Sequence, residues 1–327
     1  MSLVDLVFSD LCIDAVIENS WYKTSPDSLG AQPLPSECQA EAGEVLIALE
    51  GAHRQVGKPN FRFVWQNTPL RAQRMQLPDR AVYICRRFQD LKGGLVDLGM
   101  PRPVAAELLS PKLRDGLVVI LGKAGAGKTT AAGTLITERL STLGGICWTT
   151  ENPIELSLAG RHGNGVCYQT EADCDAGMAM QIAAMYRATP NMIFVGEARD
   201  SHTVREALIA ALSGHLVVLT LHAGDIVTGL SRLAGFHGGD NAFRVLADAL
   251  RILIHLELHN HGSLPINTTT LLHNTGRPTG TPPRVLAVEP LLVNTDSIQA
   301  TIRDGSLHLL RGEIERQRRM FMAQGTR

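Results

Sequence analysis

The stretch Gly122-Lys123-Ala124-Gly125-Ala126-Gly127-Lys128-Thr129 follows the apolar run Leu117–Leu121 and precedes a segment with helical periodicity. It fits the pattern G-x-x-x-x-G-K-[ST] at every fixed position, in the strand–loop–helix context that this pattern requires. Glycines let such a loop curl until its backbone N–H groups face a phosphate chain, and the helix after the loop adds the positive end of its dipole. The stretch therefore predicts a nucleotide-binding site on an α/β sheet.

The same pattern assigns roles to the side chains of this loop. Lys128 is expected to reach the β- and γ-phosphates, and the hydroxyl of Thr129 to hold Mg²⁺. The loop alone does not separate kinases, GTPases, recombinases and motors. The predicted nucleotide-binding residues are Gly122, Lys123, Ala124, Gly125, Ala126, Gly127, Lys128, Thr129 and Thr130.

Composition limits the class of protein. At about 150 residues per domain, 327 residues predict two domains. Hydrophobic residues make up 44% and charged residues 19%, which is typical of globular proteins. The formal net charge of -1 argues against attraction of the whole chain to DNA or anionic lipid. Six cysteines without a C-x-x-C pair indicate reduced thiols, and we expect neither a signal peptide nor a membrane span.

The hydrophobic pattern of the chain changes near residue 100. Residues 1–98 predict a small α+β domain. Its expected strands lie at Phe61–Trp65 and Ala81–Cys85, and its expected helices at Leu3–Glu18 and Glu41–Ala52. The two prolines of Gly99–Pro103 resist helix and strand alike, so we expect a hinge there and a linker over residues 99–111.

In the remaining residues, 112–327, short apolar runs alternate with helical segments and predict a parallel sheet wrapped on both faces. The expected strands are Leu117–Leu121, Ile146–Thr149, Met192–Val195 and Leu216–Leu221, and the expected helices Thr129–Leu143, Asp175–Arg187 and His202–Leu212. A long loop over residues 260–283 is expected to join the strands Ile252–Leu258 and Val285–Val293 as a hairpin.

Acidic and histidine side chains follow three of these strands. Because ligands of doubly wound sheets bind outside the carboxyl ends of the strands, Glu155, Glu197 and His222 could converge on a γ-phosphate. One carboxylate could then orient or deprotonate the attacking water, and another could fix the Mg²⁺ hydration shell. Each residue also has a plainer interpretation, since Glu151 or Glu155 could be a solvated loop acid and His215 a structural histidine.

Four motifs in order resemble those of secretion and pilus motor ATPases of the PilT/VirB11 type. The loop at 122–129 is similar to their Walker A motif, Thr150–Glu155 to their acidic box, Ile193–Asp200 to their Walker B motif, and Gly214–His222 to their His box. The likeness covers about residues 60–312. It implies a P-loop NTPase with a RecA-like α/β core and a smaller α+β, PAS-like N-terminal domain.

The resemblance also implies ATP hydrolysis, with ATP and Mg²⁺ bound between the two domains of each subunit of a homo-hexameric ring. It makes Glu155 the general base and Glu197 the Walker B acid, which holds Mg²⁺ through water. Arg62 and Arg86 correspond to arginines that reach the nucleotide phosphates. The catalytic residues that it implies are Glu155, Glu197, His215, His222, Arg62 and Arg86.

Two groups within this family are candidates for the machine that the chain drives. These are pilus retraction motors and the DotB/TraJ-like ATPases of Dot/Icm-type and IncI-type conjugative secretion systems. The diverged N-terminal domain and the replacement of an acidic-box Asp by Asn152 favour the second group. Asn191 likewise replaces an Asp that is common before the Walker B strand. We expect a cytoplasmic location and partners among the inner-membrane components of such a machine.

Other functions remain as alternatives at this point. A RecA-like DNA translocase shares the loop, the sheet and the ring, but aromatic residues make up only 5% of the chain, so direct nucleic-acid binding is not expected. A small-molecule kinase would need an acceptor pocket that no motif indicates. The arginine-rich tail Arg311–Met320 predicts a solvated helix, with peripheral docking at the inner membrane as the alternative.

Overall fold

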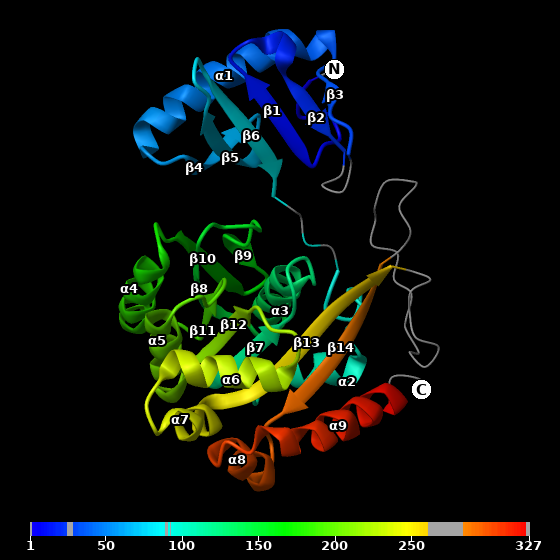
Figure 1. Cartoon of the computed structure of the whole chain (residues 1–327), viewed down its shortest axis with the longest axis vertical. Coiled ribbons are helices and arrows are strands. Elements are labelled where there is room, and N and C mark those ends of the chain that lie inside the picture. Colours follow the sequence, from blue (N-terminus) through cyan, green and yellow to red (C-terminus); the bar gives the residue numbers. More distant parts are fainter. Residues whose placement is uncertain (1, 25–28, 89–90, 92, 261–283, 325–327) are drawn as a thin grey trace. The chain divides into compact units, whose positions relative to one another are not determined.

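The computed structural model describes residues 2–24, 29–88, 91, 93–260 and 284–324 (Figure 1). The chain forms two compact units, Met1–Asp90 and Leu91–Arg327. Within the described residues, no helix combines the length and the apolar character that crossing a membrane requires. All six cysteines are free thiols.

The first unit contains a six-stranded sheet in the order β3-β2-β1-β6-β5-β4, in which every neighbouring pair of strands is antiparallel. Its elements are β1 (Asp10–Asp14), η1 (Ile17–Asn19), β2 (Trp21–Lys23), β3 (Gln32–Pro33), α1 (Ser36–Val56), β4 (Asn60–Trp65), β5 (Thr68–Gln76) and β6 (Ala81–Arg87). The strands predicted at Phe61–Trp65 and Ala81–Cys85 are confirmed as parts of β4 and β6.

Helix α1 covers one face of this sheet. Its buried residues Cys38, Ala42, Val45 and Leu49 recur every three or four positions and pack with alternate strand residues such as Phe61. The helix predicted over Glu41–Ala52 is therefore confirmed within α1. The helix predicted over Leu3–Glu18 is wrong, because its middle forms β1, a strand in the interior of the sheet with all five residues buried.

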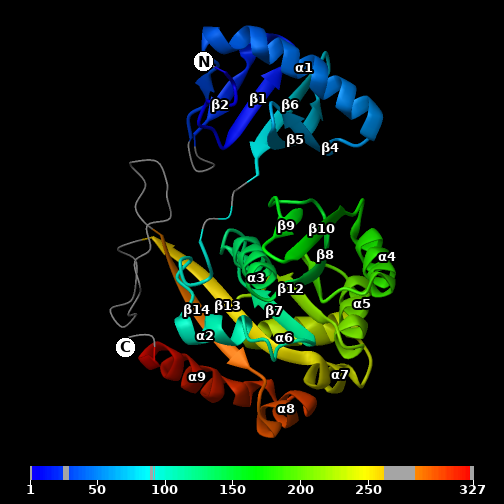
Figure 2. The same ribbon diagram turned by 180° about the vertical axis from the view of Figure 1, so that it is seen from behind.

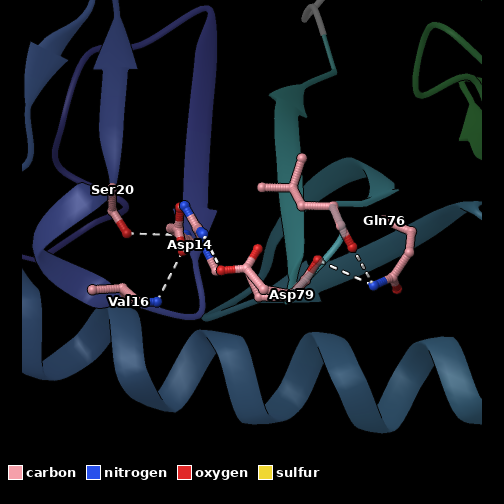
Figure 3. A network of polar contacts seen from close by, with 7 residues as sticks. Asp14, Val16, Ser20, Gln76 and Asp79 are labelled. Carbon is pink, nitrogen blue, oxygen red and sulfur yellow. Dashed lines mark hydrogen bonds and ion pairs between the residues drawn. The ribbon is translucent and has the colours of Figure 1, made fainter.

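The far end of β1 is fixed by a buried carboxylate (Figure 3). Asp14 is 5% exposed and accepts hydrogen bonds from Arg80 Nε at 2.8 Å and from the backbone N–H of Val16 at 2.9 Å. Burial by itself would raise the pKa of Asp14, but these hydrogen bonds outweigh it and leave the pKa below its usual value. The ion pair thus joins β1 to the turn between β5 and β6.

The second unit contains an eight-stranded mixed sheet in the order β14-β13-β7-β12-β11-β8-β10-β9. Strands β7, β8, β10, β11, β12 and β13 run parallel, and β9 and β14 pair antiparallel at the two edges. The strands are β7 (Gly116–Leu121), β8 (Gly145–Glu151), β9 (Gly160–His162), β10 (Gly165–Glu171), β11 (Met192–Val195), β12 (Leu216–Leu221), β13 (Leu250–Asn260) and β14 (Arg284–Leu292). All four predicted strands and the predicted β13–β14 pairing are confirmed. The loop predicted over 260–283 lies almost wholly outside the described residues.

Helices cover both faces of this sheet, as Figures 1 and 2 show from opposite sides. Alternate residues of β7 point to opposite faces, so that Leu117 belongs to the apolar cluster that contains residues of α4–α8, and Val118 to the cluster that contains residues of α2 and α3. This confirms the predicted wrapping. The helices are α2 (Arg102–Leu108), α3 (Lys128–Leu143), α4 (Asp175–Met185), η2 (Tyr186–Ala188), α5 (Ser201–Leu212), α6 (Ile226–His237), α7 (Ala242–Ala249), α8 (Asp296–Arg303), η3 (Leu307–Leu309) and α9 (Leu310–Gln324).

Residues 99–111, for which the sequence predicts a hinge and linker, instead pack within the second unit. Met100 is 1% exposed, and the two prolines precede and begin helix α2, whose Val104 and Leu108 are fully buried against the second sheet. The buried Arg139 of α3 donates hydrogen bonds to the carbonyls of Leu108 and Leu113, which fixes the chain after α2. The units therefore divide before Leu91, because apolar side chains anchor the segment after it.

Candidate nucleotide and catalytic site

The predicted phosphate loop leaves the carboxyl end of β7 and leads into α3. Gly122 has a φ of 155° and lies so close to β13 that an added Cβ would stand 2.6 Å from the carbonyl oxygen of Leu256. Gly127 has a φ of 87° and immediately precedes α3, and no side chain of the described residues caps that helix. The first N–H groups of α3 therefore remain available to an anion at the positive end of the helix dipole.

A pocket opens beside this loop and brings several of the predicted residues together. Lys128 and Thr129 from α3, Glu155 from the segment after β8, Glu197 after β11 and His222 after β12 all line it. Its other lining residues are Ala124, Gly125, Glu151, Asn152, Pro153, Gly196, Arg199 and Thr220. Its walls thus come from the carboxyl ends of neighbouring parallel strands, as the sequence predicted.

A chain of charged and polar groups crosses the pocket. Lys128 Nζ lies 3.0 Å from the carbonyl oxygen of Lys123 and 3.2 Å from His222 Nδ1. An ammonium group can only donate, so Nδ1 accepts and the histidine proton lies on Nε2, which is 2.6 Å from Glu197 Oε1. The other oxygen of Glu197 accepts two hydrogen bonds from Arg199, at 2.9 and 2.5 Å. His222 therefore lies between the Walker-type lysine and the Glu197 carboxylate, within contact distance of both.

Burial alters the charge behaviour of two groups in the pocket. Desolvation lowers the pKa of Lys128, although Glu197 and Glu155 favour its charged form. Glu151 is 2% exposed, and burial raises its pKa to about 7, despite hydrogen bonds from Thr149 and Gln169 that favour the carboxylate. The possibility that Glu151 is a solvated loop acid is therefore wrong. Glu155, in contrast, is exposed at the pocket.

Three residues in or beside the recognised motifs lie outside the pocket. His215 stands before β12 and its Nδ1 lies 3.1 Å from the carbonyl oxygen of Pro190, so β12, about 20 Å long, separates it from the pocket. The structure thus does not bring His215 to the site. Asn191 precedes β11, where its Oδ1 accepts the backbone N–H of Ile146 at 2.8 Å. Asp200 caps α5 by accepting the N–H groups of His202 and Thr203.

Arg62 and Arg86 belong to the first unit, on the sheet face opposite α1. Register pairs Arg62 of β4 with Arg71 of β5, and Arg71 with Arg86 of β6, so the three arginines form a row across three strands. The guanidinium of Arg62 lies 5.8 Å from the centre of the Phe88 ring. Arg86 forms an ion pair with Asp10, which is 6% exposed. Sequence reasoning missed Arg71 because it did not predict β5.

Sequence reasoning also missed two residues near the pocket. Arg199 lies within the Walker B-like motif, but the motif gives it no role, although its guanidinium holds Glu197. Gln169 of β10 belongs to no motif, although it contacts the segment that carries Glu155. The position of Gln169 depends on the pairing of β10 with β8, for which no short motif gives a signal.

Comparison with known proteins links this site to a family. Residues 80–321 match the sequence model of the family described as type II/IV secretion system protein. The chain is 33% identical to the type II secretion system protein HxcR of Pseudomonas aeruginosa over 174 residues. That match covers 52% of this chain and 36% of HxcR, so the chain spans about a third of this relative.

Solved structures share the fold. The crystal structure of the pilus retraction motor PilT with bound ADP superposes with a TM-score of 0.74 at 24% identity, covering 95% of this chain and 87% of that one. The ATPase DotB of Legionella pneumophila gives a TM-score of 0.69 at 20% identity, covering 94% and 85%. At these identities the likeness establishes the α/β fold with its mixed sheet.

Proposed function

We propose, from the premise that the chain belongs to the type II/IV secretion system protein family, that it is an ATP hydrolase that powers a secretion or pilus machine. The observation that carries this proposal is the chain of contacts from Lys128 through His222 to Glu197, beside the N-terminus of α3. It places an ammonium group, two exposed or half-buried carboxylates and available backbone N–H groups around one pocket. That combination suits phosphoryl transfer.

The oxygen donors of the pocket also suit Mg²⁺. Thr129 offers a hydroxyl and Glu197 a carboxylate, and Mg²⁺ characteristically takes few protein ligands and keeps several waters. Glu197 is already engaged by His222 and Arg199, which favours contact through water. Among the described residues, no cluster of three or more His, Cys, Asp or Glu side chains could hold a metal by itself. When bound with nucleotide, the ion would neutralise phosphate charge.

In the proposed reaction, each residue of the pocket has one task. The backbone N–H groups of the loop bind the phosphates, and Lys128 exchanges its contacts with Lys123 and His222 for the β- and γ-phosphates. Glu155 orients the attacking water and accepts its proton. His222 lies between Lys128 and Glu197, and a turn of its ring lets the Nε2–H group donate a hydrogen bond to the terminal phosphate.

The arginine row and the assembly complete the proposal. Arg62 and Arg86 supply positive charge that stabilises the transition state, a task for which a guanidinium is better suited than an ammonium group. The active form is a homo-hexamer in the cytoplasm, in contact with inner-membrane components. Support for these points comes from the motif resemblance and from the exposed positions of both arginines on one face of the first sheet.

For the machine, we propose a type IV secretion or conjugation system of the Dot/Icm or TraJ-like kind. The sequence departure at Asn152, which lines the pocket, favours this assignment. Pilus retraction is the second candidate, favoured by the TM-score of 0.74 with PilT. The RecA-like DNA translocase is less favoured, because the family match covers residues 80–321.

The variant Glu155→Gln tests this proposal. We expect it to bind ATP with affinity close to wild type and to lose on the order of 10²-fold or more in turnover, because the amide cannot take the proton of water. Phosphate release and nucleotide binding are measured on the full chain, with and without DNA. Glu107→Gln, an exposed carboxylate of α2 outside the pocket, is the matched control and should behave as wild type.

The results that would contradict the proposal are distinct. Near wild-type turnover of Glu155→Gln would show that the base is misassigned, and absence of ATP hydrolysis by the wild type in every oligomeric state would overturn the function. Turnover that depends on DNA would favour the translocase. In cells that carry only Glu155→Gln, loss of plasmid transfer or effector delivery supports a secretion system, whereas loss of twitching alone supports pilus retraction.

A further inference from the structure

The segment that carries Glu155 lies beside the pocket and is held by two sets of contacts, one apolar and one polar. It leaves β8 at Asn152 and runs to β9, and its apolar side chains Leu156 and Leu158 are buried against α3. They pack so closely on Gly133 that a Cβ there would lie 2.6 Å from Leu156 Cδ1. These contacts fix the far half of the segment. Glu155 itself is exposed, so its own side chain does not hold it in place.

Gln169, in the middle of β10, holds the backbone of this segment. Its Oε1 accepts hydrogen bonds from the backbone N–H groups of Leu158 and Ala159, both at 2.8 Å. Its Nε2 donates to the carbonyl oxygen of Leu156 at 3.0 Å and to Glu151 Oε1 at 2.9 Å. The four bonds use the full capacity of one amide, two donors and two acceptors, and they fix which end is oxygen.

Glu151 continues this support beneath Glu155. Its carboxyl group is buried at the end of β8, and Oε1 accepts the hydroxyl of Thr149 at 2.7 Å in addition to the Gln169 amide. The backbone N–H of Glu155 lies where it lowers the pKa of this carboxyl group, against the larger effect of burial. Gln169 therefore binds backbone groups that follow Glu155, Glu151 lies beside the N–H group of Glu155 itself, and a single hydrogen bond joins the two side chains.

We propose that Gln169 is a positioning residue for the hydrolytic reaction, which holds the Glu155 carboxylate at the phosphate pocket through the backbone of residues 155–159 and through Glu151. This inference rests on the proposed function. Gln169 does not line the pocket, so it acts only through its neighbours. Its removal should therefore change the rate of the chemical step more than the affinity for nucleotide, which the loop and Lys128 determine.

Two substitutions probe this arrangement. Gln169→Leu keeps a similar size and removes all four hydrogen bonds. Gln169→Glu can still accept from Leu158 and Ala159, but its carboxylate cannot donate to Glu151. The other charged groups that line the pocket with Glu151 are Lys128, Glu155, Glu197 and Arg199. Lowering the pH adds a proton that the introduced carboxyl group and Glu151 can share, and this restores the hydrogen bond between them.

We expect Gln169→Leu to lower kcat for ATP on the order of 10²-fold, the loss typical of a displaced catalytic group, with a much smaller change in KM. Gln169→Glu should be impaired at pH 8.5 and recover relative to wild type as the pH falls towards 6.5. Gln181→Leu is the matched control, because Gln181 also joins β8 to β10, through Thr150 and Thr170, but does not contact the Glu155 segment. It should keep kcat within a fewfold of wild type.

Amide hydrogen exchange of the ligand-free full chain gives a readout without activity. In Gln169→Leu, exchange in residues 152–159 should accelerate while β12 stays protected, and in Gln181→Leu residues 152–159 should stay protected. Unchanged exchange there, a kcat within a fewfold of wild type, or a Gln169→Glu deficit that does not vary with pH would overturn the inference. A wild type that does not hydrolyse ATP would defeat the proposed function, and hydrogen exchange would still decide whether Gln169 positions the segment.

Discussion

The two sheets of this chain place charged side chains in opposite ways. In the second unit, the parallel strands β7, β8, β11 and β12 have their carboxyl ends on the same side of the sheet. The residues after these ends meet in one pocket. In the first unit the strands are antiparallel, and the row from Arg62 to Arg86 runs across three of them at matching register positions. A parallel sheet gathers the residues that come directly after its strands, whereas an antiparallel sheet gathers residues that share a register.

This difference predicts which substitutions should lower activity and which should lower folding stability. The pocket groups after the parallel strands have partners that nucleotide can replace, such as the contact of Lys128 with His222. The arginines and carboxylates of the antiparallel sheet include pairs that hold strands together, such as Arg86 with Asp10 and Arg80 with Asp14. We therefore expect substitutions at the pocket to lower mainly the activity. Substitutions in the first sheet should increasingly lower the folding stability as well.

The largest effect is expected for Lys128→Ala. Loss of the ammonium group removes the phosphate contact, so kcat/KM should fall by at least on the order of 10³-fold. The unfolding free energy should change little, because burial of the Lys128 ammonium group costs desolvation free energy. The lowered pKa of Lys128 reflects the same desolvation. Phosphate release and thermal unfolding measure both. A variant that kept its activity, or one that unfolded near room temperature, would contradict the functional character of the pocket.

A smaller loss of activity is expected for the arginines of the row. Arg62→Ala and Arg86→Ala should each lower kcat on the order of 10²-fold if both reach phosphate, a loss comparable to that of one transition-state donor. Only Arg86→Ala should also destabilise the first unit, because it leaves the buried Asp10 without its ion-pair partner. Phosphate release measures the first effect, and hydrogen exchange of β1 and β6 measures the second.

These two variants control each other. Equal protection of β1 in both variants would show that the Asp10 pair contributes nothing to the sheet. Unchanged turnover in Arg62→Ala together with reduced turnover in Arg86→Ala would assign the phosphate contact to one arginine. Unchanged turnover in both variants would remove the row from the proposed reaction.

The sequence predicted the second sheet better than the first for a physical reason. The buried parallel strands are continuous apolar runs, such as Leu216–Leu221, and a glycine loop marks the first of them. The strand β1 has two aspartates among its five residues, and they are buried with partners that lie far along the chain. Arg80, just before β6, and Arg86, in β6, pair with them from 66 and 76 residues later. No local pattern contains that information, so the sequence around β1 predicts a helix instead.

The same reason separates the predicted from the missed parts of the site. Lys128, Glu155, Glu197 and His222 lie within a few residues after the carboxyl ends of strands, so motif order located them. His215 belongs to the same motif as His222, but it lies at the opposite end of β12, which motif order alone cannot show. Gln169 is recognised only from its four hydrogen bonds, which depend on the folded path of residues 155–159.

The smallest effect is expected for Asp14→Asn, which should leave ATP turnover unchanged and lower the unfolding free energy of the first unit by about 1–2 kcal/mol at neutral pH. Because the pKa of Asp14 is lowered in the fold, its contribution is complete above the unfolded pKa of about 4 and is lost as the pH falls through the folded value. The difference between wild type and variant should therefore shrink in acid.

Denaturant unfolding in a Trp148→Phe background measures this difference, since the remaining tryptophans, Trp21 and Trp65, both lie in the first unit. Asp79→Asn is the control, because Asp79 contacts the same Arg80 at 2.8 Å but its side chain is 69% exposed, where ion pairs contribute about 0–1 kcal/mol. Two results would contradict this prediction: an equal loss of unfolding free energy in the two variants, or a loss in Asp14→Asn that grows in acid. Burial would then not distinguish the two carboxylates, and the antiparallel sheet would not depend on its buried ion pair as the comparison requires.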